Sequence, residues 1–300
     1  MSFLKAIRSN LLEKIKNKAL FPQSNSMDNL GYWDLTSSVD FCEENYQHTF
    51  FIAEPHNVWS SLFISLFAFL GAYYGNPTNE NRFLFIYGAL FVTGIGSCAL
   101  HATLSAIWQA SDELPMLFVT LSLLYTIIEL KCPKGTYSMK GLNYIFLIVA
   151  AFNTYIYFKY QQIYAVFLAS YISSVAVVIW KSKVLLDDED VKNDASTSLW
   201  YQSFFTYIVV GSLIWLLDMN ACDFFLPYYR QMGGATLHII WHIAAGLATY
   251  LLAQSLSAMR AKSIKMKTEL EYVYGIIPVV RRMKEKALPS CINPESCNQS

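Results

Sequence analysis

Seven long apolar segments dominate this chain and restrict it to folds that can sit in a lipid bilayer. Each is about 17 to 21 residues long, close to the roughly 20 that a helix needs to cross a hydrocarbon core about 30 Å thick. Only 15% of the 300 residues are charged and the net charge is zero, which argues against a soluble or nucleic-acid-binding protein. We therefore predict an all-α fold, a bundle of seven transmembrane helices over roughly residues 57–75, 83–102, 114–130, 142–158, 163–180, 199–217 and 237–255.

The lysines and arginines between the apolar segments indicate how the bundle is oriented. If the N-terminus lies outside the cytosol, most of these residues fall on the cytosolic side, and the opposite side keeps only Lys159 and Arg230 in its loops. Basic residues next to membrane segments accumulate in the cytosol, so we predict a lumenal or external N-terminus and a cytosolic C-terminus. Basic residues between positions 5 and 18 favour the opposite orientation, but they lie far from the first segment.

The two ends of the chain differ from the seven-helix domain, which we place at residues 28–256. Leu4, Ile7 and the leucines after them recur at helical spacing among basic residues. Residues 1–27 are therefore expected to form either an amphipathic helix on the membrane surface or a flexible, solvated or partner-binding segment. Residues 257–300 are expected to form a basic tail in the cytosol.

Three of the five histidines lie at the ends of two apolar segments. His101 closes the second segment, four residues after Ser97, and His238 and His242 open the seventh. Residues four apart share one face of a helix, so His238 and His242 can bind one metal ion together. A third imidazole from another helix completes a three-nitrogen site with an open position, which is typical of catalytic zinc. The topology also brings Asp112 to this end of the bundle, so we predict a site for metal-assisted hydrolysis within the membrane.

Each of these residues also has a purely structural interpretation. A histidine near a helix end often lies at the membrane interface, or inside a bundle with its hydrogen bonds satisfied. We interpret His48 and His56 as loop or interface residues. Asp112 could cap the third helix, with Pro115 in its first turn. Ser97 could be a small residue that allows close helix packing beside two glycines.

A second group of polar residues precedes the first apolar segment. Asp40, Glu43, Asn45 and Glu54 offer carboxylate and amide oxygens within about fifteen residues, and calcium prefers such ligands, completed by backbone carbonyls. The sequence has no EF-hand pattern, and a solvated acidic loop is the alternative.

Several motifs together resemble the alkaline ceramidase family, in order from about Gly31 to about Leu252. They are Asp40-Phe41-Cys42-Glu43-Glu44-Asn45-Tyr46, Ile52-Ala53-Glu54, Gly96-Ser97-Cys98-Ala99-Leu100-His101, Asp112-Glu113-Leu114-Pro115-Met116, Leu217-Asp218, and His238 with Trp241 and His242. The resemblance implies an integral enzyme of the endoplasmic reticulum or Golgi membrane that hydrolyses the amide of ceramides. It implies a ceramide-type lipid substrate within the bilayer, and neither a nucleic-acid partner nor an obligate protein partner.

The resemblance also implies roles for individual residues. It assigns catalytic zinc to His101, His238 and His242, and catalytic or water-binding roles to Ser97 and Asp112. It assigns a structural or regulatory calcium ion to Asp40, Glu43, Asn45, Glu54 and the backbone carbonyl of Phe41. The family usually has tryptophan where this chain has Phe41, a change that a carbonyl ligand survives.

Two cysteines fall on the predicted lumenal side, where oxidation is permitted. We hypothesise a disulfide between Cys42 and Cys222, and the family resemblance points to the same pair. Such a bond would tie the N-terminal loop to the loop before the seventh segment.

Three alternatives to a ceramidase remain open. A zinc-containing receptor of the adiponectin-receptor type shares the three-histidine site, but its N-terminus is expected in the cytosol. A lipid hydrolase of the same superfamily that acts on glycolipid-anchored proteins is disfavoured by the acidic N-terminal group. A non-catalytic membrane scaffold would lose its metal without losing its function.

Overall fold

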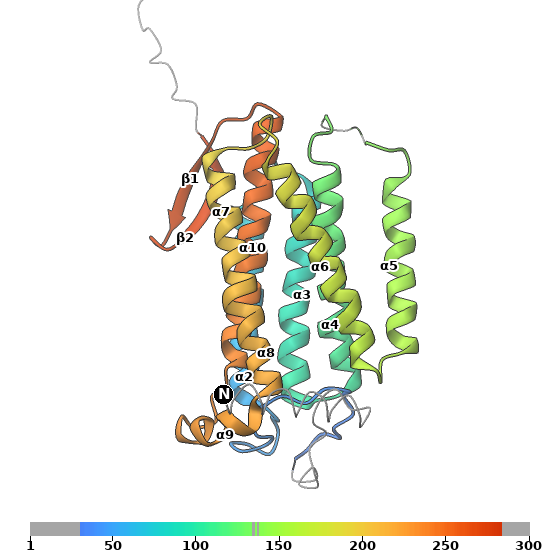
Figure 1. The fold of residues 1–300 in the computed structure, drawn as a ribbon, viewed down its shortest axis with the longest axis vertical. Coiled ribbons are helices and arrows are strands. Elements are labelled where there is room, and N and C mark those ends of the chain that lie inside the picture. The colour runs from blue at the N-terminus through green and yellow to red at the C-terminus, as the bar shows by residue number, and fades with distance from the viewer. Residues whose placement is uncertain (1–30, 134–135, 137, 284–300) are drawn as a thin grey trace, which may run out of the picture.

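The computed structural model describes residues 31–133, 136 and 138–283, and the segment 1–27 therefore lies outside the described residues. The part of the chain that it describes contains seven helices long and apolar enough to cross a membrane, which confirms the predicted helical bundle (Figure 1). These are α2 (Pro55–Tyr74), α3 (Asn81–Thr103), α4 (Ala106–Ile128), α5 (Leu142–Lys159), α6 (Tyr164–Leu186), a sixth helix over Asp194–Asn220, and α10 (His238–Ser263).

The sixth helix is continuous but not uniform. It begins as α7 (Asp194–Phe204), continues as the π-helix η1 (Phe205–Ser212) and ends as α8 (Leu213–Asn220). π-helical turns accommodate additional residues in a helix and occur frequently at functional sites. Side chains of η1 and α8 line the interior cavity described below.

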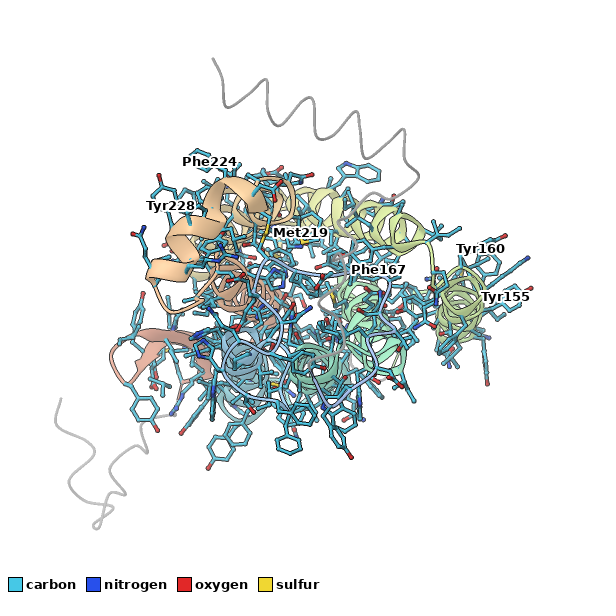
Figure 2. The ribbon with its side chains drawn as sticks, turned by 90° about the horizontal axis from the view of Figure 1, so that it is seen from below. Tyr155, Tyr160, Phe167, Met219, Phe224 and Tyr228 are labelled. Atoms are coloured by element: carbon cyan, nitrogen blue, oxygen red, sulfur yellow. A yellow bond between two sulfur atoms is a disulfide. The ribbon has the colours of Figure 1, made fainter. Side chains whose placement is uncertain are left out.

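Helix α10 lies at the centre of the bundle, where α2, α7 and η1 pack around it. Its second half is almost entirely buried and rich in alanine and serine, small residues that let neighbouring helices approach closely. In contrast, α5 stands at the edge and packs against α4 (Figure 1). Figure 2 shows Tyr155 and Tyr160 at this edge, on the outer side of the bundle, whereas Phe167 of α6 lies inside.

The third helix begins earlier than the sequence predicted. Helix α4 starts at Ala106 with Ser105 as its N-cap residue, so Asp112 and Pro115 lie inside the helix. The interpretation of Asp112 as a helix cap was therefore wrong. Gln109, Asp112 and Glu113 lower the hydropathy of this first part of the helix, which is why the apolar pattern placed its start at residue 114.

The basic tail expected from residue 257 also begins later, because α10 continues to Ser263. Strands β1 (Thr268–Val273) and β2 (Ile277–Arg282) follow as an antiparallel hairpin, with Val273 opposite Ile277. Three residues join the strands, and the first two, Tyr274 and Gly275, both have positive φ, as the central residues of a type I′ turn require. The hairpin packs on α10 and α2, and the backbone N–H of Val280 donates to Gln254 Oε1 at 2.9 Å.

A buried arginine joins several segments at the end of the bundle near this hairpin. Arg260 of α10 is only 1% exposed, and its guanidinium contacts the Glu80 carboxylate at 2.7 Å. It also donates to the carbonyls of Leu130 and Cys132 at 2.8 and 2.7 Å. One charged side chain thus links α10 to the α2–α3 and α4–α5 connections.

At the opposite end, residues 31–54 and helix α9 (Cys222–Gln231) cover the bundle (Figure 1). Phe224 and Tyr228 lie on the outer side of α9, and both are exposed (Figure 2). Cys42 and Cys222 are joined by a disulfide across 180 residues of sequence. This bond holds α9 against the N-terminal loop, next to the histidines.

Candidate metal centre

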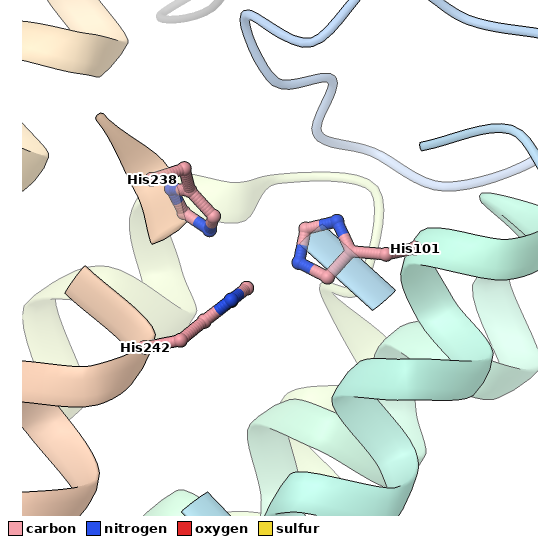
Figure 3. A group of neighbouring side chains, drawn as sticks. All are labelled: His101, His238 and His242. Carbon is pink, nitrogen blue, oxygen red and sulfur yellow. The ribbon is translucent and has the colours of Figure 1, made fainter. Parts of the chain in front are cut away.

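Three histidines from two helices meet at this end of the bundle. His101 lies in the last turn of α3, while His238 and His242 occupy the first two turns of α10 (Figure 3). One nitrogen of each ring lies within 4.8 Å of the others. All three side chains are buried, with at most 2% of each residue exposed. The group can hold a metal ion.

Two of the imidazoles have a hydrogen-bonding partner on the side away from the shared centre. His101 Nδ1 lies 2.5 Å from Glu54 Oε2, and His242 Nδ1 lies 2.7 Å from Ser60 Oγ. A partner on Nδ1 fixes the tautomer and turns Nε2 toward a metal. Glu54 precedes α2 and Ser60 lies in its second turn, so this helix orients histidines that α3 and α10 contribute.

Two of the three histidines, His238 and His242, line a cavity of about 400 Å³ inside the bundle. His238, His242, Ser97 and Asp112 line one end, and the cavity continues between α3, α4, α6, the sixth helix and α10 as far as Trp200. Most of its lining is aliphatic or aromatic. This lining suits a ligand with a polar group at the histidines and an apolar remainder.

Close packing of α3 on α4 places Ser97 and Asp112 on this cavity. A Cβ atom at Gly96 would lie 2.0 Å from the Ser111 carbonyl oxygen, so only glycine permits this approach. The Ser97 hydroxyl lies 2.9 Å from Ser61 Oγ and 3.5 Å from His242 Nε2. The structure therefore brings Ser97 and Asp112 to the cavity end that the histidines line.

The buried carboxylate of Glu113, next to Asp112 in the chain, was not predicted as a site residue from the sequence. Glu113 accepts hydrogen bonds from Gln109 Nε2 at 2.9 Å and from the Tyr157 hydroxyl at 2.7 Å. Gln109 in turn accepts from the backbone N–H of Ser38 at 2.8 Å. This network fixes α4 to α5 and to the N-terminal loop at the level of Asp112.

The polar face of α2 was also missed, although a signal for it exists. Asn57, Ser60 and Ser61 are buried and recur at helical spacing in an otherwise apolar segment. Glu54, the residue before the helix, accepts from Asn57 Nδ2 at 3.1 Å. Such a stripe on a membrane helix indicates that this face lines a polar site rather than lipid.

The acidic N-terminal loop packs directly against the histidines. The Phe41 ring lies 4.6 Å from the His101 ring and 4.5 Å from the His238 ring, centroid to centroid. Asp40 Oδ1 accepts from the Phe41 backbone N–H at 3.1 Å and lies 3.4 Å from Asn45 Nδ2. The loop that carries the predicted calcium ligands thus forms the cover of the histidine group.

Glu43 and Glu54 are both buried and electrostatically coupled. The Glu43 carboxylate accepts the backbone N–H groups of His56 and Asn57, each at 2.8 Å, at the start of α2. Burial and the Glu54 charge nevertheless raise the pKa of Glu43 from 4.5 to about 7. Burial, helped by the nearby Asp218 charge, raises the pKa of Glu54 from 4.5 to about 8. Among the described residues, no lysine or arginine forms an ion pair with either acid.

His48 and His56 lie outside the histidine group. Their Nε2 atoms lie 2.8 and 2.9 Å from the same acceptor, the Gly233 carbonyl, at the surface. They therefore hold the loop before α10 against residues 47–56. His48 is a loop residue, in keeping with its interpretation, whereas His56 lies in the first turn of α2.

Comparison with known proteins gives a consistent result. The sequence model of the family described as Ceramidase matches residues 34–281. The chain is 30% identical to alkaline ceramidase 3 of Mus musculus over 269 residues, which cover 85% of this chain and 96% of that protein. It is 28% identical to an alkaline ceramidase of Arabidopsis thaliana over 260 residues, with 85% and 96% coverage. It is 27% identical to an alkaline ceramidase of Drosophila melanogaster over 278 residues, with 86% and 92% coverage. The match extends from the N-terminal loop through all seven helices to the hairpin, and the chain therefore belongs to the ceramidase family.

Proposed function

We propose that this protein hydrolyses the amide bond of ceramides, releasing a sphingoid base and a fatty acid. The observation that carries the proposal is the placement of three buried histidines at one end of an apolar cavity that Ser97 and Asp112 also line. Membership of the ceramidase family supports the same reaction. The cavity would hold the alkyl chains and keep water away from them, while the amide group lies at the histidines.

We further propose that His101, His238 and His242 hold zinc. Three imidazole nitrogens, two of them oriented by Glu54 and Ser60, suit this ion. Zinc bound in this way supplies a Lewis acid that polarises the amide carbonyl and lowers the pKa of water.

Asp112 would transfer protons, and Ser97 would stabilise the negative charge that develops during the reaction. Asp112 takes a proton from the attacking water and delivers it to the leaving nitrogen, so that one carboxylate serves both halves of the reaction. The Ser97 hydroxyl donates a hydrogen bond to the carbonyl oxygen as negative charge develops there. Both residues line the cavity at its histidine end, which is where the amide must lie.

We propose a calcium site in the N-terminal loop, with Asp40, Glu43, Asn45, Glu54 and the Phe41 carbonyl as ligands. Asn45 Oδ1 and Glu54 Oε1 support it, because both are buried and lack a hydrogen-bond partner among the described residues. A cation would satisfy these oxygens and offset the repulsion between Glu43 and Glu54. Its role is structural or regulatory, since it would hold the cover of the histidine group in place.

We place the protein in the endoplasmic reticulum or Golgi membrane, with the N-terminus and the histidine end lumenal. The distribution of lysine and arginine supports this orientation. The disulfide between Cys42 and Cys222 at the histidine end fits an oxidising compartment. We propose that residues 1–27 form an N-terminal segment and that the ceramidase-like domain begins at residue 28. Because α10 and the hairpin belong to the bundle, this domain extends beyond the predicted boundary at 256 to about residue 282, and the cytosolic C-terminal region predicted over 257–300 begins with them.

A receptor of the adiponectin-receptor type is the principal alternative, because it shares a three-histidine site. The family match favours the enzyme. Glycosylation sites inserted near residue 31 distinguish the two, since they become modified only if this end of the chain is lumenal.

The test is ceramide hydrolysis by detergent-purified protein, with His242→Ala and His48→Ala compared and zinc quantified in all samples. His48 is a matched control, because it is an exposed histidine at the same end of the bundle. We expect a sphingoid base from the wild type and from His48→Ala, and loss of both zinc and activity in His242→Ala. Full zinc occupancy without hydrolysis of any ceramide would contradict the proposed reaction.

A further inference from the structure

Asp218 is a fully buried carboxylate at the end of α8, within a sequence motif to which no role has been given so far. Its Oδ1 accepts a hydrogen bond from the Tyr229 hydroxyl at 3.0 Å. Its Oδ2 lies 3.7 Å from His238 Nδ1, too far for a hydrogen bond. Both Oδ2 and His238 Nδ1 are buried without a hydrogen-bond partner among the described residues.

The other two histidines of the group have the Nδ1 partner that His238 lacks. His101 and His242 already have partners on Nδ1, Glu54 and Ser60, and only His238 has none. Histidine ligands of metals almost always donate their second ring N–H to a carboxylate, carbonyl or water, and the partner sets the tautomer and the ring orientation. Asp218 Oδ2, at 3.7 Å, is a buried acceptor near this nitrogen that has no hydrogen-bond partner among the described residues.

The surroundings of Asp218 hold its carboxylate in this orientation. The Tyr229 hydroxyl fixes one oxygen, and the backbone N–H groups of Leu237 and His238 are close enough to interact with the same carboxylate. The free oxygen therefore faces the first turn of α10. A shift of about 0.9 Å would bring Oδ2 and Nδ1 to the roughly 2.8 Å of a charge-assisted hydrogen bond.

We propose that Asp218 is the positioning residue for His238. When zinc binds, Oδ2 accepts the Nδ1–H of His238, which leaves Nε2 free to coordinate the ion. The bond removes two unsatisfied buried polar atoms at once, so its formation favours the occupied site. This inference rests on the proposed zinc centre. With it, each of the three histidines has its own partner: Glu54, Ser60 or Asp218.

A purely structural role for Asp218 would affect the stability of the protein rather than its affinity for zinc. As an N-terminal cap for α10 and a partner for Tyr229, it would stabilise the protein whether or not zinc is present. As a positioning residue, it acts mainly on the affinity for zinc. The two roles separate when zinc affinity and the denaturation midpoint of zinc-free protein are measured on the same variants.

The experiment is a zinc titration of full-length protein in detergent against a competing chelator. Asp218→Ala removes the acceptor, and Asp218→Asn keeps the shape but removes the charge. Asp223→Asn is the matched control, because Asp223 is an exposed aspartate in the first turn of α9. We expect Asp218→Ala to weaken zinc binding by about 10- to 100-fold, as loss of such a partner typically does, with Asp218→Asn between it and the control.

Tyr229→Phe provides a second route if Asp218→Ala does not fold. It leaves the carboxylate in place but releases Oδ1, so it should weaken zinc binding in the same direction by a smaller factor. Zinc affinities of the Asp218 and Tyr229 variants within about threefold of Asp223→Asn would overturn the inference. So would a loss confined to the stability of the zinc-free protein. A wild-type protein that binds no zinc would instead refute the metal centre itself, which keeps the two failures distinct.

Discussion

Removal of calcium should make the stability of this protein fall steeply as pH rises. Glu43 is 3% exposed and Glu54 fully buried, and burial raises the pKa values of the two carboxyls from 4.5 to about 7 and about 8. Repulsion by the Glu54 charge adds to the rise in the pKa of Glu43. Without a cation, both acids therefore hold their protons more tightly in the folded than in the unfolded chain.

The sign of the effect follows from this difference in proton binding. Below about pH 4.5 the carboxyls are protonated in both states, and the free energy of unfolding is at its highest with respect to these groups. As pH rises, the unfolded chain releases protons first, so stability falls until the folded-state pKa values are passed near pH 8. The shift at Glu43 alone corresponds to roughly 3 kcal/mol, since one pKa unit is worth about 1.4 kcal/mol.

Thermal denaturation of detergent-purified protein between pH 5 and 9 measures this loss, with and without a calcium-selective chelator. We expect the Glu43 shift alone to lower the midpoint in chelator by roughly 6 to 12 °C over this range, given about 2 to 4 °C per kcal/mol for a chain of this size, and the Glu54 shift to add to this fall. Calcium should abolish the fall, because it stabilises the deprotonated carboxylates. Glu54→Gln should reduce it, whereas Glu44→Gln should not, because Glu44 pairs with Arg230 and its pKa is lowered. A flat profile in chelator, or an equal fall in calcium, would refute the reasoning.

Three further changes test other parts of the structure. Asp112→Asn should lower ceramide turnover by about 10²- to 10⁴-fold with zinc content unchanged, and unaltered turnover would exclude Asp112 as the proton carrier. Arg260→Ala should lower the free energy of unfolding by about 1 to 3 kcal/mol in denaturant titrations, because it leaves the Cys132 carbonyl without its buried donor, whereas Glu80 still pairs with Arg82 and the Leu130 carbonyl with Ser263. Exposed Lys262→Ala should cost less than about 1 kcal/mol, and similar losses in both would contradict the buried network. Cys222→Ser should cost roughly 2 to 5 kcal/mol, and wild-type protein under reducing conditions should show the same loss.

The helical bundle and the histidine group were predictable because both depend on local patterns. Hydropathy over about 20 residues identifies a membrane helix without knowledge of its neighbours. The i, i+4 spacing of His238 and His242 places them on one face, and the alternation of helices brings His101 to the same end. No side-chain detail is needed for either conclusion.

The features that were missed depend on contacts between distant segments. The hairpin looked like a solvated tail because Lys265, Lys267 and Arg281 surround it, yet Val279 and Val280 are buried against the bundle. The partners of the histidines were invisible for a similar reason. Ser60 and Asp218 meet the rings only through the relative rotation of three helices, which no sequence window contains.

The π-helical segment fixes the number of residues that the sixth helix needs to present Asp218 toward His238. Each residue turns an α-helix by about 100°, so a segment that holds additional residues sets the rotational phase of everything after it. Deleting one residue from 205–212 would let the helix wind as a regular α-helix and would turn Asp218 away from His238. The hydropathy of the helix would hardly change, and the protein would still insert into a membrane. Insertions and deletions in the sixth helix should therefore be compatible with zinc binding only in compensating pairs.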